Sequence, residues 1–135
     1  MAIWLVKTEP NEYSYADLVR DGEAEWDGVT NPTAQLHLRS MAVGDRVVVY
    51  HSGNERAAIG LATVVKAPYP DPTDLKGKRV WVHLLAERQL PSAVPLATLR
   101  GEPSFADSML VRMSRLSVMP LTAEQLATID RLAAP

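Results

Sequence analysis

The chain has 135 residues, 47% of them hydrophobic and 22% charged, which is enough for one domain with a sizeable core. Its 14 basic and 16 acidic residues give a net charge of −2, which excludes a histone-like protein that holds nucleic acid by bulk charge alone. There is no cysteine, which excludes disulfides and thiolate chemistry. Because no run of residues approaches the length of a membrane span, we expect one cytoplasmic domain over residues 1–135 with no membrane partner.

Alternating hydrophobicity and β-branched or aromatic content predict five short strands. They are expected over residues 2–7, 46–51, 58–66, 79–87 and 115–118. Prolines predict an irregular loop that begins at Pro68, after the third strand, and a polar segment between Pro91 and Pro95, after the fourth.

Capping signals mark the helices. Ser14 and Thr122 each precede an acidic or amide side chain by three residues, which is the pattern of a capping box. Asn31 followed by Pro32 predicts another helix start, with Asn as the N-cap and Pro at the first helical position. Helices are therefore predicted over residues 14–20, 33–41, 95–99 and 122–133, and residues 26–31 are predicted to form a loop.

The predicted strands and helices do not alternate regularly, so a doubly wound parallel sheet is not expected. They indicate an α+β protein built on a curled β-barrel of about five or six mostly antiparallel strands, with short flanking helices. No internal repeat, low-complexity tract or linker divides the chain, which agrees with a single domain.

The common catalytic and cofactor motifs are missing from the sequence. The three histidines lack metal-ligand spacing, and the glycines form neither a dinucleotide fingerprint nor a phosphate-binding loop. Ser52 follows His51 directly but lacks the G-x-S-x-G context of a nucleophilic serine. We therefore expect no metal, no cofactor and no serine nucleophile.

Polar and aromatic residues gather in three clusters at the ends of predicted elements, where binding sites are usually built. Their rings, small residues and directional polar groups suit the binding of a flat polar heterocycle. The clusters are Lys7, Glu9 and Tyr13; Trp26, Gly28 and Asn31; and Tyr50, His51 and Ser52.

Some of these residues also have purely structural explanations. Asn31 is an effective helix cap by itself, and Lys7 and Glu9 share one face of a strand, where they can form an ion pair. Trp26 differs because an aromatic ring among acidic residues and glycine is typical of a partly exposed side chain, which favours a binding role.

Several motifs, in order along the whole chain, resemble the EVE domain, a member of the PUA-like superfamily. They are Trp4-Leu5-Val6-Lys7-Thr8-Glu9-Pro10, Tyr13-Ser14, Trp26-Asp27-Gly28-Val29-Thr30-Asn31, Leu38-Arg39, Gly44-Asp45, Tyr50-His51-Ser52, Ala67-Pro68-Tyr69-Pro70-Asp71, Trp81, and Arg115-Leu116-Ser117-Val118 before Pro120-Leu121-Thr122. One departure is Thr30, where the family usually has Arg, so a positive charge beside the expected pocket is absent.

The resemblance implies a curled sheet with a pocket for a modified base, similar to YTH domains, which bind methylated adenine in RNA. EVE domains are associated with modified cytosine in DNA, and roles with modified RNA are proposed for bacterial members. On this basis we expect non-catalytic binding of a modified base, in DNA or RNA, by insertion into an aromatic-lined pocket. The expected pocket residues are Trp26, Gly28, Val29, Asn31, Tyr50, His51 and Ser52, with Lys7, Glu9 and Tyr13 at its rim or floor.

Arginine outnumbers lysine in this chain, which favours phosphate contacts because the guanidinium fork matches phosphate geometry. The expected phosphate contacts are Arg39, Arg56, Arg112 and Arg115. The chain has no nuclease motif, so any partner nuclease is left open.

A second hypothesis is a small hydrolase acting on a modified base or nucleoside, as resemblance to ASCH proteins implies, with Lys7 and Glu9 supplying a nucleophile or general acid and base. A third is a protein-interaction module that uses the helix over 122–133.

Overall fold

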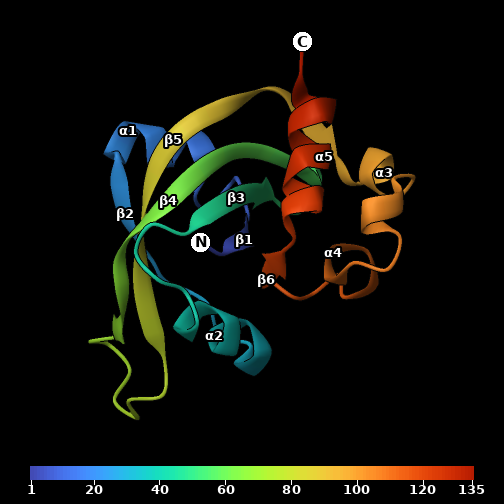
Figure 1. The fold of residues 1–135 in the computed structure, drawn as a ribbon. Coiled ribbons are helices and arrows are strands. Elements are labelled where there is room, and N and C mark those ends of the chain that lie inside the picture. Colours follow the sequence, from blue (N-terminus) through green and yellow to red (C-terminus); the bar gives the residue numbers. More distant parts are fainter.

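Six strands form one mixed sheet in the order β2-β5-β4-β3-β1-β6, in a computed structural model that describes all 135 residues. The strands are β1 (Ile3–Thr8), β2 (Glu23–Trp26), β3 (Arg46–His51), β4 (Ala57–Pro70), β5 (Val80–Pro95) and β6 (Val118–Leu121). The neighbours β1 and β3 are parallel, and all other neighbours are antiparallel. The expected curled α+β fold is confirmed, and the sheet stays open because β2 and β6 do not pair (Figure 1).

Short helices cover the ends and the hollow of this sheet (Figure 1). They are α1 (Tyr15–Asp21), α2 (Pro32–Arg39), α3 (Leu96–Leu99), α4 (Met109–Arg112) and α5 (Ala123–Ala133), with a 3₁₀ turn over Pro103–Phe105. The predicted caps are confirmed: Ser14, Asn31 and Thr122 each accept a hydrogen bond from a backbone N–H in the first turn. No helix of the structure has the length and hydrophobicity needed to span a bilayer.

The strands β4 and β5 are longer than predicted because both run through prolines. Pro68 lies where the register between β4 and β5 shifts, and Pro91 lies in a second irregular stretch of the same pair. Proline has no backbone N–H to donate, and it is tolerated at such bulges because no ladder hydrogen bond is required there. The predicted loop therefore begins after Pro70 rather than at Pro68, and the polar segment between Pro91 and Pro95 belongs to β5.

The two edge strands were also misjudged. Residues 23–26 form β2, although Trp26 was predicted to lie in a loop. The last strand begins at Val118 rather than at residue 115, and it contains Pro120. Pro120 is compatible with this position because β6 is an edge strand, where one side of the backbone makes no ladder hydrogen bonds.

Candidate functional site

A cavity of about 490 Å³ opens where the ends of β1 and β2 approach each other. This volume falls within the usual range for sites that bind small ligands. The wall combines two aromatic rings with many charged groups, and it comes from distant parts of the chain. The lining residues are 7–9, 12, 13, 21, 23–29 and Ser117.

Trp26 and Tyr13 form an aromatic corner in the wall of this cavity. Their ring centroids are 6.1 Å apart, and the ring planes are inclined at 80°. Trp26 ends β2 and pairs with Val82 of β5, and the indole is only 6% exposed. The predicted partial exposure of Trp26 was therefore wrong, because pairing with an interior strand draws the ring into the core.

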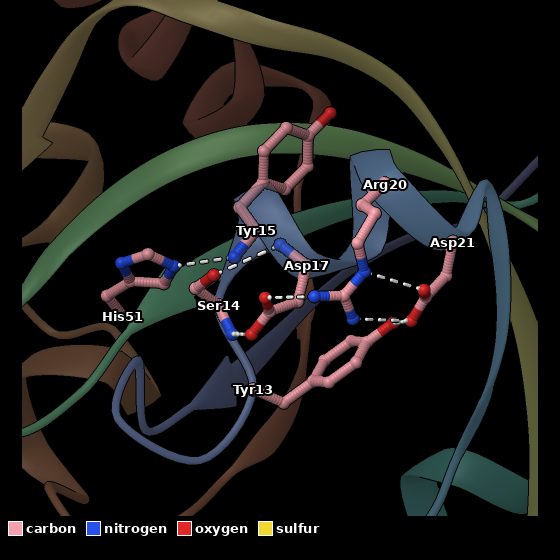
Figure 2. Close-up of polar contacts among 7 residues, drawn as sticks. All are labelled: Tyr13, Ser14, Tyr15, Asp17, Arg20, Asp21 and His51. Carbon is pink, nitrogen blue, oxygen red and sulfur yellow. Dashed lines mark hydrogen bonds and ion pairs between the residues drawn. The ribbon is translucent and has the colours of Figure 1, made fainter.

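The phenol of Tyr13 is fixed by the end of α1 (Figure 2). Its hydroxyl donates a hydrogen bond to Asp21 Oδ2 at 2.8 Å, and Arg20 Nε pairs with the other oxygen of that carboxylate at 3.0 Å. Burial, together with the hydrogen bond to Asp21, raises the pKa of Tyr13 to about 12. Tyr13 thus stays neutral at physiological pH and acts as a fixed wall.

His51 connects the end of β3 to the start of α1 (Figure 2). Its Nε2 atom accepts a hydrogen bond from the backbone N–H of Tyr15 at 2.9 Å, and Nδ1 lies 3.0 Å from Glu55 Oε2. Because Nε2 acts as the acceptor, the ring proton belongs on Nδ1, where it is donated to Glu55. Both ring nitrogens of His51 are therefore committed to structure.

Lys7 and Glu9 both line the cavity, but the ion pair considered from the sequence is not formed. Lys7 Nζ donates to the carbonyl oxygen of Ser114 at 2.9 Å and lies 5.5 Å from the ring centroid of Tyr50. Glu9 Oε1 instead accepts a hydrogen bond from the backbone N–H of Asn11 at 3.3 Å. Burial lowers the pKa of Lys7.

The charge of the cavity wall is strongly acidic. Lys7 is the single basic residue in the lining. The hydrogen bonds from Arg20 and Tyr13 lower the pKa of Asp21, so this carboxylate is charged at neutral pH. No three acidic or histidine side chains meet as a metal-ligand group. The six carboxylates belong to Glu9, Glu12, Asp21, Glu23, Glu25 and Asp27.

The family model of the EVE domain matches residues 2–132. The chain belongs to the EVE domain family. Among solved structures, this EVE domain is similar to Rpa0253 from Rhodopseudomonas palustris, with 41% sequence identity and a TM-score of 0.93. That match covers 98% of this chain and 93% of the other.

This EVE domain is also 30% identical to human thymocyte nuclear protein 1, over 90% of this chain and 69% of that protein. The human THYN1 protein has been solved in complex with DNA that contains 5-methylcytosine. That structure matches with 28% identity and a TM-score of 0.90, covering 100% of this chain and 99% of the other. A mutant ASCH protein from Zymomonas mobilis, with 11% identity over 98% of this chain and 99% of its own and a TM-score of 0.60, shows similarity of fold alone.

Six of the predicted site residues come together around the cavity of the EVE domain, and four do not. Asn31 caps α2 through its side-chain oxygen, which accepts from the Ala34 N–H at 3.0 Å, and it borders a separate hollow. The other three end β3 or follow it, where they support α1 and β1 from behind the wall. The residues at the cavity are Lys7, Glu9, Tyr13, Trp26, Gly28 and Val29; those away from it are Asn31, Tyr50, His51 and Ser52.

The four predicted phosphate contacts are dispersed over the surface. Arg39 lines a second hollow beside α2, and Arg115 borders the same hollow as Asn31. Arg56 and Arg112 are exposed and line neither of these hollows. The four arginines therefore do not line one common hollow.

Several residues that line the cavity were not predicted from the sequence. Glu23 and Glu25 belong to β2, which was not predicted, and Asp27 follows directly. The signal that was available is the alternation of Glu23 and Glu25 with Ala24 and Trp26, which is the period of a strand with one polar face.

Proposed function

We propose that this EVE domain binds a modified base of a nucleic acid, without chemical turnover, by inserting the base into the cavity beside Trp26. The observation that carries the proposal is that human THYN1 has been solved in complex with DNA containing 5-methylcytosine. The fold of that protein matches this chain over its whole length. The aromatic corner of Trp26 and Tyr13 supports it, because an unstacked base gains about 1–3 kcal/mol when it packs against an aromatic ring.

The acidic lining favours bases that carry an exocyclic amine, cytosine among them, over thymine and uracil. Carboxylates accept hydrogen bonds from the exocyclic amine of cytosine, whereas thymine and uracil have no such donor. Glu9, Glu12 and Asp27 line the cavity and supply the acceptors. Glu23 is instead bonded to His83 Nδ1 at 2.7 Å. A buried methyl group contributes only about 0.8 kcal/mol, roughly a fourfold preference, so the carboxylates must fix the base edge for the methyl group to be read.

Binding of fluorescent oligonucleotides tests the proposal. Single- and double-stranded DNA and RNA carrying cytosine, 5-methylcytosine, adenine, N6-methyladenine or thymine at one position are titrated with wild type, Trp26→Ala and Trp81→Ala. Trp81 is the matched control, because it also meets a tyrosine edge-on, Tyr69 at 6.2 Å, but lies outside the cavity. We expect Trp26→Ala to lose the preference for the modified base and Trp81→Ala to keep it.

A folding control is needed because Trp26 is buried. Circular dichroism and thermal unfolding of both tryptophan variants show whether they are folded at the assay temperature. Asp27→Asn removes an exposed carboxylate of the cavity lining, and it should weaken binding of the cytosine-bearing strands more than binding of the thymine-bearing strand. Retention of the full modified-base preference by folded Trp26→Ala would overturn the proposal.

A hydrolase is the second candidate, and the position of Lys7 favours it. Lys7 lines the cavity, and its pKa is lowered by burial, as a nucleophilic or basic lysine requires. Incubation with modified nucleosides and mass spectrometry of the products tests this function. Product release by wild type that is lost in Lys7→Met would establish the hydrolase, and the absence of any new product would leave base binding as the function.

A further inference from the structure

A second hollow of about 360 Å³ lies beside the cavity and is lined by residues of α2 and of the loop that joins β4 to β5. Figure 1 shows where this helix and this loop lie in the fold. We call this hollow the basic groove. Four of its lining residues are cationic and one is acidic, so its charge is opposite to that of the cavity. The charged residues are Arg39, Lys76, Lys78 and Arg79, with Asp74 as the single carboxylate.

A buried amide joins the groove to the cavity. Gln35 of α2 is only 4% exposed, and its Nε2 donates to the carbonyl oxygens of Val29 at 2.8 Å and Val80 at 3.3 Å. Its Oε1 accepts from the backbone N–H of Val80 at 2.9 Å. Val29 lines the cavity and the next residue, Thr30, lines the groove, so the two hollows are adjacent.

The loop that carries the cations is hydrogen-bonded within itself and to α2. Asp74 accepts hydrogen bonds from the backbone N–H groups of Lys76, Lys78 and Arg79 at 3.1, 2.8 and 2.8 Å. These bonds, chiefly the one from Arg79, lower the pKa of Asp74. The Asp74 carboxylate is therefore bound to backbone N–H groups of the loop rather than to the side chain of a groove cation. Arg39 donates to the carbonyl oxygen of Lys78 and fastens the loop to α2.

The long side chains of Lys76, Lys78 and Arg79 have no ion-pair partner, and all three residues are exposed. Unpaired cations on a hydrogen-bonded loop are suited to phosphate groups, which the acidic cavity next to them repels. We propose that the basic groove binds the phosphodiester backbone next to the inserted base. This inference rests on the proposed function, and it explains how a protein of net charge −2 contacts a polyanion.

The test is the salt dependence of oligonucleotide binding. The double variant Lys76→Gln/Lys78→Gln is compared with wild type for cytosine- and 5-methylcytosine-bearing strands. Losing two phosphate contacts should weaken both complexes equally, by at least about 10-fold at low salt, and should reduce the slope of log K against log salt concentration by about 1.5. The ratio of the two affinities should not change.

The matched control is Arg88→Gln/Arg131→Gln, which removes the same charge from exposed positions outside the groove. We expect this control to retain the wild-type slope. Equal losses in the two double variants would mean that only net charge matters, and an unchanged slope in the groove variant would also overturn the inference. If wild type shows no modified-base preference but the groove variant still loses affinity and slope, the proposed function fails while the groove assignment stands.

Two further arms complete the experiment. Thr30→Arg adds a cation at the junction of groove and cavity, and it should raise affinity and increase the slope by about 1. Inorganic phosphate is added to the wild-type complex against chloride at equal ionic strength. Displacement by phosphate well beyond that by chloride would identify the groove as a site for free phosphate and overturn its assignment to the phosphodiester chain.

Discussion

The backbone of Gly60 in β4 lies directly beneath the ring of Tyr15, and a Cβ atom at Gly60 would be 2.3 Å from Tyr15 Cζ. Tyr15 is 1% exposed, and its hydroxyl donates to the carbonyl oxygen of Leu61 at 2.7 Å. The ring therefore anchors α1 to the sheet, and its contact with Gly60 leaves no room for a side chain at that position.

Gly60→Ala should consequently lower the free energy of unfolding by about 2 kcal/mol or more, because overpacking forces a rearrangement of the core. Gly101→Ala is the control, since its Cβ would meet only Thr98 O at an ordinary 3.6 Å. Urea unfolding followed by circular dichroism measures both variants. A change of less than about 0.5 kcal/mol for Gly60→Ala would show that the ring of Tyr15 moves freely.

Gly53→Ala should affect both stability and the cavity. Gly53 has φ +75°, and an added Cβ would be 2.4 Å from Glu9 Oε2. Gly22→Ala is the control, because Gly22 has the same φ but nothing within 4 Å. Each variant should lose about 1–2 kcal/mol through backbone strain. The additional displacement of Glu9 predicts weaker ligand binding in Gly53→Ala; equal binding by the two variants would contradict this role of Glu9.

Asp45→Asn should destabilise the protein in a pH-dependent manner. The carboxylate accepts hydrogen bonds from Trp4 Nε1 at 2.9 Å, the Ala42 N–H at 2.9 Å and the Ala2 N–H at 3.1 Å. Burial alone would raise the pKa of Asp45, but these hydrogen bonds outweigh burial and lower it.

Because the folded-state pKa of Asp45 lies below the unfolded value of about 3.9, its stabilisation is complete above that pH and is lost as the pH falls through the folded value. The variant should be less stable than wild type by about 1–3 kcal/mol near neutral pH. Unfolding midpoints at neutral pH and at successively lower values below about pH 4 measure the difference. A stability difference between wild type and Asp45→Asn that grows as the pH falls would contradict this prediction.

His51→Ala should destabilise more than Glu55→Ala. Removing the imidazole leaves the buried N–H of Tyr15 without its acceptor, which costs about 1–3 kcal/mol. Glu55 is exposed, and loss of its contact with His51 should cost less than about 1 kcal/mol. Chemical unfolding of both variants is the measurement. Equal losses would indicate that the interaction with Glu55, rather than the one with Tyr15, matters most.

The helix starts were predictable because capping is local. Ser14, Asn31 and Thr122 each bond a backbone N–H three residues ahead, so the sequence contains the whole interaction. The four-residue strand β2 was not predictable in this way, because its formation depends on β5, about sixty residues later, as in the pairing of Trp26 with Val82. Strand ends and proline bulges depend on the same distant partners.

The site was partly predictable for a related reason. Motif residues at the ends of β1 and β2 line the cavity, whereas Tyr50 does not, although it pairs with Lys7 in the sheet. Lys7 Nζ lies over the Tyr50 ring, so Lys7 reaches the cavity and Tyr50 lies behind it. A motif read along the sequence does not show which of two paired residues reaches the cavity. The groove cations Lys76 and Lys78 were missed because the loop could be placed beside α2 only once the contacts of Gln35 were known.

The buried amide of Gln35 has a mechanical consequence. Val80, which it holds, lies two residues before Val82, the partner of Trp26, so roughly 7 Å of a single strand connects the groove to the aromatic wall. The separation of the two hollows is therefore set by β5 and by the hydrogen bonds of Gln35. A ligand that fills both must carry its ring and its negative charge at that fixed separation, so affinity should rise in one step when a nucleoside acquires its neighbouring phosphates, and little thereafter.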